Sequence, residues 1–403
     1  MVSASLWRRS SRGDKKKNMG TREDYVRASL ALSMIPSIGG GRIRRLFEHF
    51  RDPMSVFSAD WASLSAVASI GAIVARSIRD FSEWEKVDRL LMMTKKHGMA
   101  LLTPYDECYP GRLLHIYDPP AVLWARGNTE ALKRDFLAVV GTRKPTCDGR
   151  DVTIRLTRSL IQKTQAGIVS GLAHGVDTLA HLEALRNKRC TVAVMACGLD
   201  RVYPAGNRSL AFDIMKSGGA MISEYPPGTK PESHHFPVRN RIVSGMSVGV
   251  VVTETGVSGG SMITASAALD QGREVFAVPH SVWNERGEGC NRIIQRGWGK
   301  LVSDAEDIIS ELPLNMRLDL PSSGSGEIPQ AFLQRVRERL ENPGTDPSEK
   351  AVLQLLADKE RHIDEISREA GIASHVLLTL LLKLELDGII LQVPGKKFTL
   401  SKL

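Results

Sequence analysis

The sequence predicts an α/β protein with a doubly wound parallel sheet, a small helical N-terminal domain and a C-terminal winged helix. Short apolar runs alternate with helical patterns between residues 136 and 310, which is typical of a parallel sheet covered by helices. Two similar glycine turns lie among the helical patterns of residues 21–100. Three helical patterns and a hairpin pattern occupy residues 348–403. The central region is therefore expected to have a Rossmann-like fold.

Residues 21–100 contain two turns of the same kind. Residues 35–39 (Ile-Pro-Ser-Ile-Gly) and 67–71 (Val-Ala-Ser-Ile-Gly) each have the pattern apolar–x–x–apolar–Gly, and each precedes a helical pattern. This pattern indicates a helix-hairpin-helix or SAM-like domain, in which N–H groups at a helix N-terminus contact a phosphate. The alternative is a small helical domain whose glycines only form turns.

Residues 101–311 form the predicted Rossmann-like domain. A proline-rich connector ends in an expected strand at residues 122–125. Six further strands are predicted at Phe136–Val140, Ile168–Ser170, Thr191–Ala196, Met221–Ser223, Val248–Thr253 and Glu274–Ala277. They are short apolar runs, as a sheet buried on both faces requires. Helical patterns lie between them, such as residues 148–164 and 177–186.

Residues 312–347 are rich in Pro, Ser and Gly and predict a linker that contains a helix at residues 330–340. Residues 348–403 predict the winged helix. Its third helix, residues 374–386, is mostly apolar, and Lys383 is its only Lys or Arg. A helix that reads DNA bases needs polar side chains. This apolar helix is therefore expected to pack against other protein surface, such as a partner, rather than to enter a DNA groove.

Charge and composition limit the partners that the chain can bind. The formal net charge is +9; residues 1–20 hold six basic side chains against Asp14, which gives +5 and leaves +4 for the rest. A DNA site in the folded body must therefore be a local basic pocket. Residues 1–20 are expected to be either a disordered tail, with Met19 as an alternative start, or a DNA-binding tail.

The five cysteines indicate reduced thiols, because they are scattered and no His/Cys cluster has the spacing of a zinc site. No segment is long and apolar enough for a signal peptide or a membrane span. No G-x-G-x-x-G opens the first helix of the sheet domain, and no P-loop occurs. We therefore expect a cytoplasmic protein without a metal, a cofactor or a membrane partner.

Glycine-rich turns follow the predicted strands, and the carboxyl ends of parallel strands meet at one edge of a sheet. Gly141 and Arg143 follow the first strand, Ser170 and Gly171 lie at the end of the second, and Asn207 follows the third. These turns predict a concave edge lined by backbone N–H groups. We expect DNA to bind there.

The turn Gly259-Gly260-Ser261 is the best single candidate for an anion site. It follows the strand predicted at residues 248–253 and precedes a helical pattern. Glycines allow a ligand to approach the backbone, and the helix adds its positive end. Sulfate, a nucleotide phosphate and a DNA phosphate all suit this turn.

The segment Phe236-Pro-Val-Arg-Asn-Arg-Ile-Val-Ser-Gly245 is interpreted as an aromatic–proline turn before a helix start. Arg239 and Arg241 suit bidentate contact with phosphate, Asn240 suits a base edge or a sugar, and Phe236 can stack on a base. The alternative is a surface ion-pair cluster with Phe236 in the core.

Five motifs in this order resemble the DprA/Smf family. They are Val139–Arg143, Ser170–Asp177, Gly198–Pro204, Phe236–Arg241 and Ser258–Thr264. The resemblance covers about residues 25–310 and implies an extended Rossmann fold, a homodimer and a pocket for single-stranded DNA. It also implies that the protein protects incoming DNA and loads RecA recombinase during natural transformation. The DNA role is carried onto Arg143, Phe236, Arg239, Asn240 and Arg241.

The sequence departs from the family pattern at Asp148, at Ser233–His235 and at His280, where the family often has tyrosine, basic residues and glycine. The first two departures are expected to weaken DNA binding near neutral pH.

No catalytic constellation is found in the sequence, so no enzymatic activity is expected. A rival hypothesis is an enzyme that hydrolyses a nucleotide N-glycosidic bond: Glu254 ends a strand, and Gly259–Thr264 is distantly similar to the glycine turn of phosphoribohydrolases. The Arg-Asn-Arg segment suits a polymer better. A third hypothesis, a winged-helix transcription regulator, is disfavoured by the apolar third helix.

Overall fold

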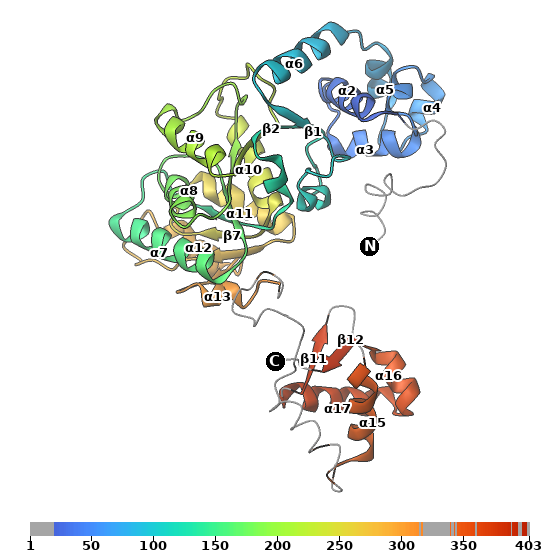
Figure 1. Cartoon of the computed structure of the whole chain (residues 1–403), viewed down its shortest axis with the longest axis vertical. Helices are drawn as coiled ribbons and strands as arrows, with labels where there is room; N and C mark the ends of the chain where they lie inside the picture. Colours follow the sequence, from blue (N-terminus) through green and yellow to red (C-terminus); the bar gives the residue numbers. More distant parts are fainter. Residues whose placement is uncertain are drawn as a thin grey trace. The chain divides into compact units, whose positions relative to one another are not determined.

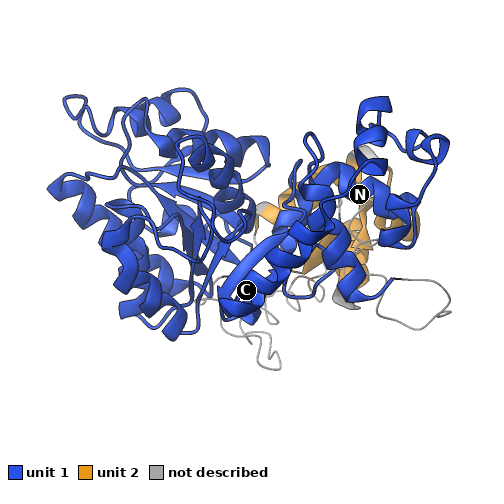
Figure 2. Ribbon diagram, turned by 90° about the horizontal axis from the view of Figure 1, so that it is seen from above, with its two compact units in different colours: residues 1–320 blue, residues 321–403 orange. Residues whose placement is uncertain are grey.

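The computed structural model describes residues 20–313, 316, 339, 342, 345–358, 361–387, 389–393 and 397–400. It divides into two compact units, residues 1–320 and 321–403 (Figure 2). The predicted tail, apart from Gly20, lies outside the described residues, and so does most of the predicted linker with its helix. The predicted fold class is confirmed by a large, mostly parallel sheet, a helical N-terminal region and a C-terminal winged helix (Figure 1).

The N-terminal region is helical and contains the two similar turns. Its elements are α2 (Arg22–Ser33), α3 (Gly40–His49), the 3-10 helix η2 (Pro53–Phe57), α4 (Trp61–Ser65), α5 (Ala72–Arg79) and α6 (Trp84–Lys96). The turns end at Gly39 and Gly71, the N-caps of α3 and α5, and both contain a serine of positive φ, Ser37 at 68° and Ser69 at 67°. The Arg42 guanidinium donates to the carbonyls of both serines. The turns are therefore two copies of one conformation, joined by an arginine.

Nine strands form the central sheet, in the order β1-β2-β6-β5-β4-β3-β7-β8-β9. They are β1 (Ala100–Leu102), β2 (Leu123–Gly127), β3 (Phe136–Val140), β4 (Gly167–Ser170), β5 (Thr191–Met195), β6 (Ala220–Ser223), β7 (Ser247–Val252), β8 (Glu274–Ala277) and β9 (Lys300–Leu301). β2 pairs antiparallel with both of its neighbours, β1 and β6, near one edge, and the other neighbouring pairs of this sheet are parallel. From β3 the chain first adds strands on one side and then returns to add β7 on the other. The switch point of this doubly wound sheet therefore lies between β3 and β7.

Helices cover both faces of the sheet. The first face carries α7 (Cys147–Lys163), α8 (Val176–Arg186) and α13 (Glu306–Ile309); the second carries α10 (His235–Met246), α11 (Gly260–Asp270) and α12 (Glu288–Gln295). Alternate residues of β3 point to opposite faces, so Leu137 and Val139 pack in the first layer and Phe136, Ala138 and Val140 in the second. A third cluster joins α2, α6 and α9 (Arg208–Lys216) to the edge of the sheet that contains β1 and β2.

The C-terminal unit contains α15 (Pro347–Asp358), β10 (Arg361–His362), α16 (Ile363–Ala370), α17 (Ser374–Leu386), β11 (Ile390–Val393) and β12 (Lys397–Leu400). Its three strands pair antiparallel in the order β10-β12-β11. In the apolar helix α17, Leu377, Leu381 and Leu384 are buried, whereas Leu378 and Leu382 are exposed. Across the described part of the chain, no helix is long and apolar enough to cross a membrane.

Candidate nucleic-acid interface

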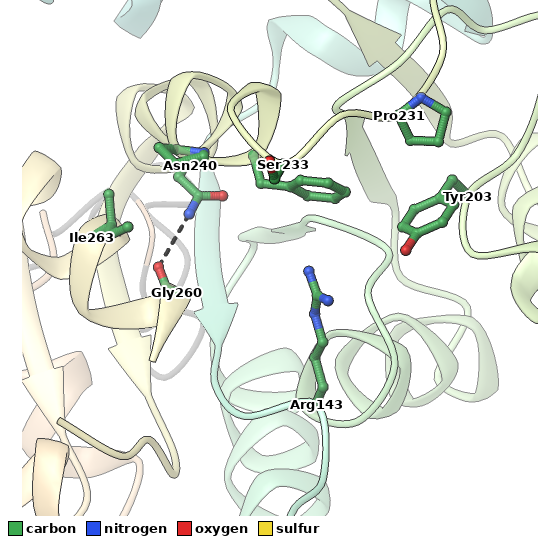
Figure 3. A pocket seen from close by; sticks show the side chains of 9 residues that line it. Arg143, Tyr203, Pro231, Ser233, Asn240, Gly260 and Ile263 are labelled. Atoms are coloured by element: carbon green, nitrogen blue, oxygen red, sulfur yellow. Dashed lines mark hydrogen bonds between the residues drawn. The ribbon is translucent and has the colours of Figure 1, made fainter. Parts of the chain in front are cut away.

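A pocket of roughly 390 Å³ opens beside the carboxyl ends of the strands, near the switch point (Figure 3). We call it the strand-end pocket. It is lined by Arg143, Tyr203, Pro231, Ser233, Phe236, Pro237, Asn240, Gly260 and Ile263. These residues come from segments that follow β3, β5, β6 and β7, so the topology of the sheet brings them together. One arginine and no carboxylate occur among the lining residues, which suits an anionic ligand.

Arg143 supplies the positive charge of the strand-end pocket. It follows β3 in an exposed position, and its side chain extends into the pocket (Figure 3). The guanidinium carbon lies 5.3 Å from the centroid of the Phe236 ring. No hydrogen bond or ion pair joins this guanidinium to another residue that the structure describes. Its N–H donors therefore remain available for an oxygen anion while the ring face holds the group in place.

Two aromatic rings form one side of the pocket. The centroids of Phe236 and Tyr203 are 5.7 Å apart, and the ring planes are inclined by 58°. Tyr203 is 41% exposed, and Phe236 is half-buried as the second residue of α10. An exposed or half-buried ring allows a nucleic-acid base to stack on it.

The start of α11 forms another side of the pocket. Asn240 Nδ2 donates to the carbonyl of Gly260 over 3.1 Å (Figure 3). No atom lies within 4 Å of the position that a Cβ on Gly260 would take, so a ligand can approach this backbone. Gly259 is needed for a different reason, because a Cβ there would lie 2.3 Å from Thr255 Oγ1. Ser261 is buried and donates to the same Thr255 oxygen over 2.6 Å. The backbone at Gly260, at the N-terminus of α11, is therefore open to an approaching anion.

Arg239 does not line the pocket but lies beneath it. Its guanidinium is buried and donates to the carbonyls of Gly171, over 2.7 Å, and Val194. A Cβ on Gly171 would lie 2.5 Å from Arg239 Nη2, so only glycine leaves room for this contact. Burial lowers the pKa of Arg239, against the opposing charge of Asp177, and burial raises the pKa of Asp177. Arg239 therefore ties α10 to the ends of β4 and β5.

Arg241 is also engaged within the chain. It pairs with Glu224 and lies 3.8 Å from Asp118, and its side chain is only 18% exposed. The prediction that Phe236 and Pro237 form a turn before the helix is wrong, because both lie within α10, which begins at His235. Successive helical residues point about 100° apart, so Phe236 and Asn240, four residues apart, share the pocket face while the two arginines point elsewhere. The DNA contacts predicted for Arg239 and Arg241 stay predictions. The guanidinium groups of both residues already donate hydrogen bonds to other groups of the chain.

Three other predicted residues shape the loops around the pocket without lining it. A Cβ on Gly141 would lie 2.6 Å from Val176 Cγ2. Ser170 is buried and donates to the carbonyl of Val139 over 2.7 Å. Asn207 Nδ2 donates to the carbonyl of Leu172 over 2.8 Å. The DNA contacts predicted for them also stay predictions.

Glu254, the acid of the rival enzyme hypothesis, has a structural position. Its buried carboxylate accepts hydrogen bonds from Thr146 N (2.8 Å), Thr146 Oγ1 (2.7 Å) and Asn284 Nδ2 (3.1 Å). It does not line the strand-end pocket. His280 supports the same region, with Nε2 2.7 Å from the carbonyl oxygen of Thr253. Glu254 therefore holds the start of α7 rather than facing a ligand.

Five lining residues were not among the predicted contacts: Tyr203, Pro231, Ser233, Pro237 and Ile263. Tyr203 carried a usable signal, since it belongs to the Gly198–Pro204 motif and is an aromatic residue after a strand end. The other four have no distinctive residue type, and only the folded loops bring them to the pocket.

Comparisons with known proteins agree with this architecture. A family model described as DNA recombination-mediator protein A matches residues 100–313, and a model of the DprA winged helix domain matches residues 337–396. The chain is 43% identical to DNA processing protein DprA of Bacillus subtilis over 57% of this chain and 77% of that protein. It is 36% identical to protein Smf of Escherichia coli over 77% of this chain and 80% of that one. The X-ray structure of DprA from Streptococcus pneumoniae is similar with a TM-score of 0.59 and 32% identity, covering 72% of this chain and 98% of that chain.

Proposed function

Because this chain belongs to the DprA/Smf family of DNA recombination mediators, we propose that it binds single-stranded DNA in the strand-end pocket and loads RecA recombinase onto it. In this proposal the protein also protects incoming DNA during natural transformation. The family supplies the recombination role. The pocket supplies the way in which a single strand is recognised.

One observation carries the DNA proposal: among the residues that the structure describes, Arg143 has no partner for its donors, and it lies on the Phe236 ring in a pocket lined by no carboxylate. An arginine attracts a phosphate, and an adjacent ring accepts a base. Bases of a duplex are stacked inside the double helix and cannot reach such a ring. The pocket therefore favours a single strand over a duplex.

The residues around the pocket divide into contacts and supports in this proposal. Arg143 and the N–H groups at the start of α11 hold phosphates, and Phe236 and Tyr203 stack on bases. Asn240 fixes the start of α11 through its bond to Gly260. The inner residues keep the loops in place: Gly141, Ser170, Gly171, Asn207, Arg239, Arg241, Gly259 and Ser261.

We further propose that the chain acts as a homodimer in the cytoplasm and has no enzymatic activity. The five cysteines are all free, which fits a reducing compartment. The buried contacts of Glu254 favour a binding protein over a nucleotide hydrolase. The helical region at residues 21–100, the sheet domain at 101–311, the linker at 312–347 and the winged helix at 348–403 are the proposed domains.

Gel-shift titrations with single-stranded and duplex DNA of the same sequence test the proposal. We expect the single strand to bind more tightly and no hydrolysis of AMP or ATP above background. Equal affinity for both DNAs would overturn the pocket proposal, and base release that depends on Glu254 would favour the enzyme. RecA filament formation on DNA coated with a single-strand-binding protein tests the loading step separately.

A further inference from the structure

The turn that leads into α10 brings together three side chains that bind metals. Glu232, His234 and His235 each offer one ligand atom, and these atoms lie within 4.8 Å of one another. We propose that this turn binds one borderline divalent transition metal ion, with Zn²⁺ as its representative. A carboxylate and two imidazoles form a ligand set that zinc accepts, with the remaining position left to water or another oxygen ligand.

The distances agree with one shared ion. Two zinc–ligand bonds of about 2.05 Å at a tetrahedral angle place their ligand atoms ~3.4 Å apart. His234 Nδ1 and Glu232 Oε2 are 3.6 Å apart, too far for a good hydrogen bond but close to that separation. The third ligand atom, from His235, lies within 4.8 Å of both, and the turn is closed by the hydrogen bond from His235 N to the carbonyl of Glu232 over 3.0 Å.

His235 gives independent support for a missing ligand. The residue is 9% exposed, and its Nδ1 is buried without a hydrogen-bond partner among the described residues. A buried polar atom of this kind is uncommon, because leaving it unsatisfied costs free energy. The ring is held between Tyr225 (centroids 4.1 Å apart) and His234 (4.3 Å), so it is already oriented. A metal ion bound at this turn would give this nitrogen a partner.

The positive end of α10 opposes a cation at this place, and the carboxylate of Glu232 offsets it. The sequence does not predict the site, since two adjacent histidines and an acid lack the spacing of His/Cys zinc motifs. The ligands lie within residues 231–236, the same short segment that gives the strand-end pocket Pro231, Ser233 and Phe236. A bound ion would therefore stiffen the segment that presents Phe236. Metal binding itself requires no DNA, so the proposal stands apart from the proposed function.

Calorimetric titration of the untagged, chelator-treated full chain with ZnCl₂ tests the site, with Co²⁺ absorption as a second readout of its ligands. We expect one ion per chain. His234→Gln should weaken binding at least about tenfold, or ~1.4 kcal/mol. The His234 side chain is 70% exposed, so this variant should keep its fold, and His235→Gln should act in the same direction.

Two control variants make the result specific. His115→Gln removes another exposed imidazole, and Cys147→Ser removes an exposed thiol; both should bind zinc like the wild type. Absence of binding, or equal zinc affinity in the wild type and His234→Gln, would overturn the proposal. So would a Co²⁺ spectrum with thiolate bands that Cys147→Ser abolishes.

Discussion

Replacing Arg143 by alanine should weaken single-stranded DNA binding and also flatten its dependence on salt. Arg143 is the only Lys or Arg among the residues that line the strand-end pocket, and its guanidinium has no hydrogen-bond partner among the described residues. Each phosphate contact in single-stranded DNA contributes about 0.7 to the slope of log affinity against log salt. If Arg143 contacts one phosphate, the slope should fall by this amount.

The expected size follows from that slope. A fourfold change, from about 50 to about 200 mM salt, should reduce the affinity of the variant ~2.6-fold less than that of the wild type. At the lower salt concentration, loss of a charge-assisted contact should cost about 1.5–3 kcal/mol. Arg143→Lys keeps the charge but loses the planar group on the Phe236 ring, so it should keep the slope and lose part of the affinity. Fluorescence anisotropy with a labelled oligonucleotide at five salt concentrations measures both quantities.

The matched control is Arg155→Ala, which removes the same charge from an exposed position of α7 that does not line the pocket. It should leave the slope near the wild-type value. The reasoning is refuted if Arg143→Ala keeps the wild-type affinity and slope while deletion of residues 1–20 abolishes binding. That result would place the DNA on the basic tail.

Four other predictions follow from the same structure. Phe236→Ala should cost about 1–3 kcal/mol of affinity for each base it stacks on while leaving the salt slope unchanged in the same anisotropy assay. Arg239→Met should lower the free energy of unfolding in urea by about 3–5 kcal/mol, because it leaves the Gly171 and Val194 carbonyls without their donor and the buried Asp177 without its opposing charge; a loss below ~1 kcal/mol would contradict its supporting role. A chain ending at residue 320 should fold and keep most of its single-stranded DNA affinity, and loss of that affinity in gel shifts would make the winged helix part of the site. Burial lowers the pKa of His181 to about 3, so the unfolded chain binds one more proton than the folded chain between about pH 3 and 6.5, and stability should fall by up to ~1.4 kcal/mol per pH unit as the pH drops through this window; His181→Gln should lose this dependence in urea titrations at pH 5 and 7.

The strands that bury many residues could be predicted from sequence, and the shortest could not. β3 has the predicted bounds, Phe136–Val140, because five consecutive apolar residues leave few alternatives for a buried strand. β1 and β9 have three and two residues, too few for a pattern, and they form only because neighbouring strands offer an edge. Whether such short segments become strands is therefore decided by pairing with neighbouring strands and not by their local sequence.

The candidate site was only partly predictable for a different reason. Residue types identified the segment from Phe236 to Arg241, but not the direction of each side chain. Direction depends on where α10 begins, and a helix from His235 turns Asn240 toward the pocket and Arg239 toward the buried carbonyls. The sequence therefore suggested two phosphate contacts. In the fold, Arg241 pairs with the carboxylate of Glu224, and Arg239 donates to carbonyls at the ends of β4 and β5. Those partners are distant in sequence and become visible only in the fold.

Photo-crosslinking of a single-stranded oligonucleotide that carries 5-iodouracil tests the central claim most directly. After irradiation, digestion and mass spectrometry locate the residue joined to the base. We predict adducts on Phe236 or Tyr203, the two rings of the strand-end pocket, and their loss when excess unlabelled single strand competes. Adducts confined to residues 1–20 or to the winged helix, with none in the pocket, would contradict the account.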